Sequence, residues 1–89
     1  MLGNVYCVPV ASARADRALG SVLRELRLRA PKRSQEDVAF NAGITAGALA
    51  KIELGRSSPE WRTVRSIAQA LGIDLVELAQ LIERAEAGN

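Results

Sequence analysis

The fold of this chain is decided by residues 34–54, SQEDVAFNAGITAGALAKIEL. Ser34 is a favoured N-cap residue, and the acidic residues after it suit the positive end of a helix dipole, so a short helix is predicted to begin there. Gly43 can adopt the left-handed conformation that closes a helix and turns the chain. Thr45 is a second N-cap candidate, and the helix that it opens is expected to end near Leu54. The stretch therefore predicts two short helices joined by a tight turn.

An amphipathic helix is predicted upstream, from Asp16 to the Ala30-Pro31 step, because proline cannot continue a helix. Apolar residues recur there with helical spacing at Leu19, Val22, Leu23 and Leu26. The preceding residues, 1–14, carry no sustained helical or strand period and are interpreted as an N-terminal arm of uncertain order. Residues 15–87 are expected to form a single domain.

Two further helices are predicted downstream. Ser58-Pro59-Glu60 offers a cap, a proline at the first helical position and an acid in the first turn. The buried stripe expected for that helix consists of Trp61, Val64, Ile67, Ala68 and Leu71. Asp74 with Glu77 resembles a capping box and opens a last helix. The apolar side expected for this last helix is made by Leu75, Leu78, Leu81 and Ile82. The predicted fold class is all-α, a compact five-helix domain.

Composition excludes several function classes. The chain has one cysteine, Cys7, and no histidine, which removes disulfide frameworks, Cys/His zinc sites and imidazole catalysis. The Asp74–Glu77 pair is explained by capping, so we predict no catalytic residue, metal or cofactor, and no enzyme. No apolar run reaches the length of a membrane span, and the N-terminus lacks a basic signal region, so a cytoplasmic protein without a membrane partner is expected. Cys7 is interpreted as an ordinary thiol, with a redox switch as the alternative.

Charge is distributed unevenly along the chain. Residues 1–33 hold seven basic residues against two acidic ones, a net charge of +5, whereas residues 66–89 have a net charge of −3. A basic N-terminal segment followed by an acidic C-terminal one is typical of a protein that binds a polyanion on one side. The basic run preceding the second helix is either a solvated face or a set of phosphate contacts, and it consists of Arg24, Arg27, Arg29, Lys32 and Arg33.

The arrangement resembles the lambda-repressor-like helix-turn-helix regulators, also called the XRE family. Four features carry the resemblance and together extend over roughly residues 19–82. They are Ser34-Gln35-Glu36 opening the second helix, Ala39 with Ala42-Gly43-Ile44-Thr45 through the turn, Ile52-Glu53-Leu54-Gly55-Arg56 ending the third helix, and Ser58-Pro59 before the fourth. The resemblance implies a regulator of transcription that binds double-stranded DNA through the third helix. A homodimer is expected because one short domain contacts few base pairs and two half-sites extend the readout. Repression is the default outcome, with activation by contact with RNA polymerase as an alternative.

The resemblance also implies the contact residues. Those expected to meet DNA are Gln35, Thr45, Ala46, Gly47, Ala48, Lys51, Arg56 and Ser57, with Lys32 and Arg33 available to hold phosphate. Glu53 matches an acid that is usually structural and ties the following loop, with Arg56 and Ser57, to the third helix. Most of the third helix carries no side-chain hydrogen-bonding group, so direct readout is expected from Thr45, Lys51 and Gln35, from contacts between alanine and thymine methyl groups, or from DNA shape.

The dimer contact has two candidate locations. The fifth helix has an apolar side wider than one core-facing stripe needs, and its candidate interface residues are Val76, Ala79 and Glu83. The alternative is the apolar segment of residues 1–10. A second functional class stays open as well, because the bare third helix and this segment also suit a protein-interaction module such as an adaptor or an antitoxin with a toxin partner.

Overall fold

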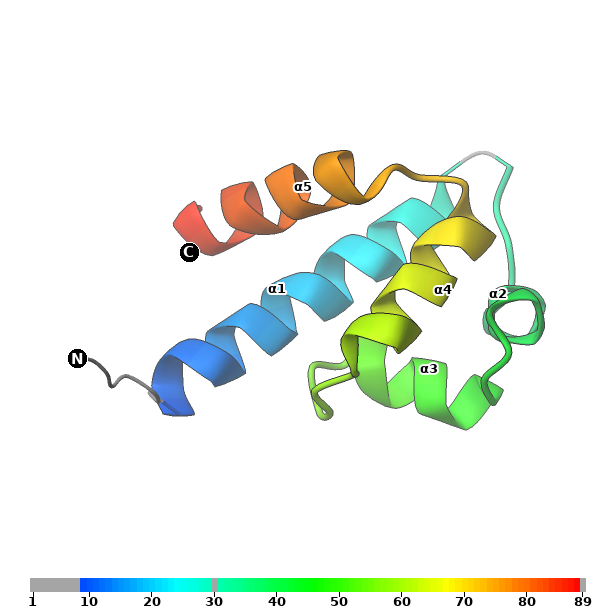
Figure 1. Ribbon diagram of the computed structural model, residues 1–89, viewed down its shortest axis with the longest axis horizontal. Helices are drawn as coiled ribbons and strands as arrows, with labels where there is room; N and C mark the ends of the chain where they lie inside the picture. The colour runs from blue at the N-terminus through cyan, green and yellow to red at the C-terminus, as the bar shows by residue number, and fades with distance from the viewer. Residues whose placement is uncertain (1–8, 30, 89) are drawn as a thin grey trace.

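Helices account for all the regular secondary structure in the computed structural model, which describes residues 9–29 and 31–88 (Figure 1). In chain order they are α1 (Pro9–Leu28), α2 (Gln35–Ala42), α3 (Ala46–Glu53), α4 (Trp61–Leu71) and α5 (Leu75–Ala87). The all-α prediction with five helices is confirmed for this part of the chain. No helix within it combines the length and apolarity that crossing a membrane requires.

Three helices begin at the caps that the sequence predicts. The Ser34 hydroxyl oxygen accepts a hydrogen bond from the Asp37 backbone N–H at 3.0 Å, and the Thr45 hydroxyl oxygen accepts one from the Ala48 N–H at 3.0 Å. The Asp74 carboxylate likewise accepts from the Val76 N–H at 2.7 Å. Each bond satisfies an N–H that has no partner inside its helix.

The start of α1 differs from the prediction. The helix begins at Pro9, not Asp16, so residues 9–14 of the predicted arm are helical. Proline is well suited to the first turn of a helix, and the alanines that follow propagate one without requiring an apolar stripe. Residues 1–8 lie outside the described residues, and with them Cys7 and most of the alternative dimer segment.

The start of α4 also differs. The helix begins at Trp61 with Glu60 as its cap residue, whereas Pro59 was expected at the first helical position. The Ser58 hydroxyl, predicted as the cap, donates a hydrogen bond to the Asp16 carboxylate of α1 instead. The placement of Trp61 in the core is wrong, because 67% of its surface is exposed. Trp61 is the first residue of α4, and its helical spacing alone could not indicate how far the other helices cover the start of α4.

A single core joins the helices. Its fully buried side chains come from all five of them: Leu23, Val38, Leu49, Ile67 and Leu78. In Figure 1, α5 runs beside α1, while α2, α3 and α4 are grouped toward one end of the molecule. The α1 helix contacts both α5 and α3, so it connects the group that contains α3 to the C-terminal helix.

Candidate nucleic-acid interface

The turn between α2 and α3 directs one side of α3 away from the core. Gly43 has φ 76°, a left-handed backbone conformation that residues other than glycine adopt with strain. The Ile44 N–H donates a hydrogen bond to the Ala39 carbonyl, which closes α2. Leu49 and Ile52 hold α3 onto the core, with exposed fractions of 0% and 4%. The opposite side, with Gly47 and Lys51, is exposed. Within the described part of the chain, no other segment covers this side of α3.

A buried ion pair fixes the end of α3 to α1. The Glu53 carboxylate accepts hydrogen bonds from Arg27 Nε at 2.8 Å and Arg27 Nη2 at 3.0 Å, and both residues are buried. The pKa of Arg27 is raised above its ordinary value, mainly by the hydrogen bond to Glu53, so the guanidinium stays charged. Arg27 Nη1 donates to the Arg33 carbonyl at 2.9 Å, and Gln35 Nε2 donates to Glu53 at 3.0 Å. The network ties α1, the start of α2 and the end of α3 together.

These bonds refine three of the sequence predictions. The structural role of Glu53 is confirmed, but its carboxylate bonds Arg27 of α1 and Gln35 of α2, whereas a tie to the loop after α3 was expected. Arg27 does not belong to a basic surface, because only 8% of it is exposed. The Gln35 amide nitrogen is bonded to Glu53, so its role toward DNA stays a prediction, and the bond anchors the first turn of α2.

Arg33 joins the α1–α2 loop to α4. Its guanidinium donates to the carbonyls of Ala70 at 3.0 Å and Leu71 at 3.4 Å, which are among the last carbonyls of α4 and lack helical partners. Lys32, next to it, is exposed. Phosphate contact by Arg33 thus stays a prediction, while its observed contacts stabilise the end of α4.

Gly20 sets the distance between α1 and α3. A Cβ atom at this position would lie 2.2 Å from the Ile52 carbonyl oxygen and 2.7 Å from that of Glu53. Both oxygens belong to the backbone at the end of α3, so a side chain would force the helices apart. Gly20 was not among the residues predicted from the sequence; its signal there is an isolated glycine inside a helical pattern, which can have a packing reason.

A hollow of about 710 Å³ opens beside the exposed side of α3. It brings together five of the predicted contact residues: Thr45, Gly47, Ala48, Lys51 and Ser57. Gln35, Ala46 and Arg56 do not line it. Further residues of the α3–α4 loop and the start of α4 complete its wall, among them Ser58, Pro59, Glu60 and Thr63. Glu60 and Thr63 were not predicted as site residues, because their approach to α3 depends on how the α3–α4 loop folds back.

The hollow carries one charge of each sign. Lys51 and Glu60 are both exposed, and neither side chain forms a hydrogen bond or ion pair with any side chain of residues 16–29 or 31–88. The other polar side chains around it are neutral hydroxyls. A cation and hydroxyl donors beside a smooth helix suit contact with a polyanion, and the carboxylate does not.

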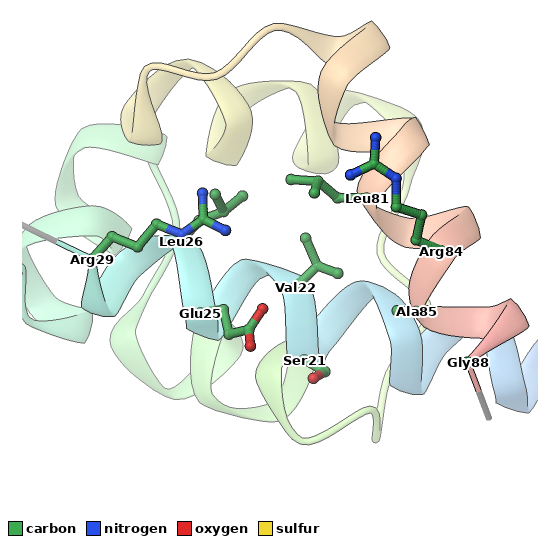
Figure 2. Close-up of a pocket in the computed structure, with 9 residues that line it drawn as sticks. All are labelled: Ser21, Val22, Glu25, Leu26, Arg29, Leu81, Arg84, Ala85 and Gly88. Atoms are coloured by element: carbon green, nitrogen blue, oxygen red, sulfur yellow. The ribbon is translucent and has the colours of Figure 1, made fainter.

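A second hollow, of about 420 Å³, lies between α1 and α5 (Figure 2). Val22, Leu26 and Leu81 lie between the two helices, and charged side chains surround them: Glu25, Arg29 and Arg84. The residues predicted for a dimer contact lie elsewhere on α5. Val76, Ala79 and Glu83 are all exposed, Val76 by 66%, so they are available to a partner.

This helical arrangement is similar to that of known proteins. A family model described as a helix-turn-helix domain matches residues 18–81. Two crystal structures of the clp gene regulator ClgR from Corynebacterium glutamicum are similar in fold. One is 23% identical with a TM-score of 0.77, over 82% of this chain and 77% of that one. The other is 22% identical with a TM-score of 0.74, over 80% and 91%. None of the curated proteins matches the chain.

Proposed function

This chain belongs to the helix-turn-helix domain family, and from that premise we propose that it is a transcription regulator that binds double-stranded DNA sequence-selectively as a homodimer. The observation that carries the proposal is the open side of α3, where Gly47 and Lys51 are exposed beside a hollow of about 710 Å³. A helix that projects from a tight turn in this way fits the major groove of B-DNA. The similar ClgR structures, of a gene regulator, support the same assignment.

The proposed contact face has distinct parts. Lys51 supplies donors for guanine or phosphate, and the hydroxyls of Thr45 and Ser57 reach the groove or the backbone. Arg56 follows α3 and, with Lys32 before α2, meets phosphate. The remaining proposed contacts are Gln35 and Arg33, whose side chains are also bonded within the protein, and the small residues Ala46, Gly47 and Ala48.

The small residues of α3 decide how bases are read. Ala46, Gly47 and Ala48 offer no side-chain donor or acceptor, so the helix can approach the groove closely, but it reads few base edges directly. Methyl contacts with thymine and the shape of the duplex supply the rest of the selectivity.

Dimerisation extends the readout. One domain of this size covers few base pairs, and two half-sites together give useful specificity. The proposed interface is on α5 at Val76, Ala79 and Glu83, where an exposed valine widens the apolar side of the helix. A bound dimer blocks access to its site, so repression is the proposed outcome, with contact to RNA polymerase as the route to activation. Such a protein works in the cytoplasm.

A protein-interaction module is the second candidate function, with a toxin as its candidate partner. The observation that favours it is the exposure of three large apolar side chains, Phe40, Leu54 and Trp61, by 84%, 61% and 67%. Exposed aromatic side chains are common at protein–protein interfaces.

Duplex binding measured against salt separates the two functions. Fluorescence anisotropy with a random-sequence duplex should give a binding constant that falls steeply as salt rises, because phosphate neutralisation releases counterions. Selection from a random duplex pool should then recover a palindrome, whose half-site spacing reports the dimer. Absence of measurable duplex binding at low salt would refute the regulator and favour the interaction module.

A further inference from the structure

The hollow beside α3 contains a carboxylate that the fold does not use. Glu60 occupies the cap position of α4 with extended backbone angles, φ −66° and ψ 156°, yet its side chain makes no capping hydrogen bond. Glutamate is not among the residues that favour this position. Its carboxylate has no hydrogen bond or ion pair with any other described residue. Helix capping therefore does not explain this side chain.

The negative charge of Glu60 differs from every other group that lines the hollow. The hollow is otherwise lined by Lys51, by the hydroxyl side chains of Thr45, Ser57, Ser58 and Thr63, and by small or apolar residues. Each of these groups tolerates or attracts phosphate, and Glu60 alone among the lining residues repels it. On the proposed function, this acid lies at the surface that meets a polyanion.

We propose that Glu60 is a specificity-determining residue of the duplex interface, one that disfavours phosphate in the hollow and accepts a hydrogen bond from a base amino group. The inference rests on the proposed function and deepens it. A carboxylate accepts well from the cytosine N4 amino group in the major groove. Gly47 and the alanines of α3 provide no side-chain acceptor, and Lys51 only donates. Glu60 thus complements Lys51, since a G·C pair presents acceptors on guanine and a donor on cytosine.

The negative charge of Glu60 therefore raises selectivity between duplexes and lowers the affinity for random DNA. On a random duplex no amino group is placed to compensate the repulsion, so Glu60 weakens binding. On the preferred duplex the carboxylate gains a hydrogen bond that offsets it. Removing the charge should therefore strengthen binding to random DNA and reduce the ratio of specific to random affinity.

The test compares Glu60→Gln with the wild type and with Glu25→Gln. The control makes the same change of net charge, but Glu25 is exposed on α1, at the hollow that faces α5 (Figure 2). Each protein is titrated with the duplex recovered by selection and with a random-sequence duplex of equal length. The melting temperature of Glu60→Gln should match that of the wild type, because the carboxylate makes no bond within the described residues.

Glu60→Gln should bind the random duplex roughly 3- to 10-fold more tightly, the effect of one unit charge removed from the neighbourhood of phosphate in high dielectric. Its affinity for the recovered duplex should not rise, so the ratio of specific to random affinity falls by at least the same factor. Glu25→Gln should leave the ratio unchanged. An equal change on both duplexes for Glu60→Gln, in either direction, overturns this inference alone. Failure of the wild type to bind any duplex overturns the inference together with the proposed function.

Discussion

Gly20→Ala and Gly47→Ala make the same substitution in two helices, and the structure predicts opposite effects on stability. Alanine at a compatible position ordinarily stabilises by about 0.4–1 kcal/mol, because it restricts the unfolded chain. At Gly47 a Cβ atom meets nothing within 4 Å. The variant should therefore gain about 0.4–1 kcal/mol and melt roughly 2–8 °C higher.

At Gly20 the same Cβ atom would lie 2.2 Å from the Ile52 carbonyl oxygen and 2.7 Å from that of Glu53. Neither oxygen can move without shifting the end of α3, so α1 and α3 must separate by about 1 Å, a gap that forfeits part of their dispersion energy. Overpacking of this kind costs about 1–3 kcal/mol. Gly20→Ala should melt lower by roughly 4–24 °C.

Both variants can be compared with the wild type by thermal unfolding followed by circular dichroism, and by urea titration to obtain the free energy of unfolding. Since the two variants differ only in position, the sign of the difference isolates the α1–α3 contact from helix propensity. A Gly20→Ala protein as stable as Gly47→Ala would refute the close approach of the two helices.

Three further outcomes follow from the site and the proposed dimer. Arg27→Met should lower the free energy of unfolding by about 3–5 kcal/mol, because it leaves the Glu53 carboxylate buried and without its main partner. Arg24→Met changes an exposed residue of the same helix and should lower the free energy of unfolding little. Equal losses in the two variants would contradict the buried network. Because the pKa of Arg27 is raised, its contribution is fully present below the ordinary arginine pKa and is lost only as the pH rises through the raised value, so the Arg27→Met deficit in urea titrations should not shrink through deprotonation of Arg27 between about pH 5 and 9. Lys51→Ala should weaken binding to the selected duplex by about 1–3 kcal/mol, and an equal loss on random DNA would assign Lys51 to phosphate alone. Val76→Glu should convert a dimer to monomer in sedimentation experiments, and a dimer that persists would move the interface off this part of α5.

The caps of α2, α3 and α5 show what the sequence determines well. Ser34, Thr45 and Asp74 each bond to a backbone N–H two or three residues away, and such bonds depend on little beyond the local chain. The left-handed turn at Gly43 is equally local. The number of helices, their order and the exposed side of α3 followed from these signals and from helical spacing.

Contacts between distant segments were decided by the tertiary structure alone. Arg27 and Glu53 are 26 residues apart, and in the sequence Arg27 is one member of a basic run with nothing to separate it from the others. Helical spacing likewise placed Trp61 in a core that does not cover it, although Val64 in the same turn of α4 packs against that core. Glu60 gained a place beside α3 only through the path of the loop. Local hydrogen bonds are specified by neighbouring residues, whereas burial and charge pairing depend on which surfaces meet when the whole chain packs.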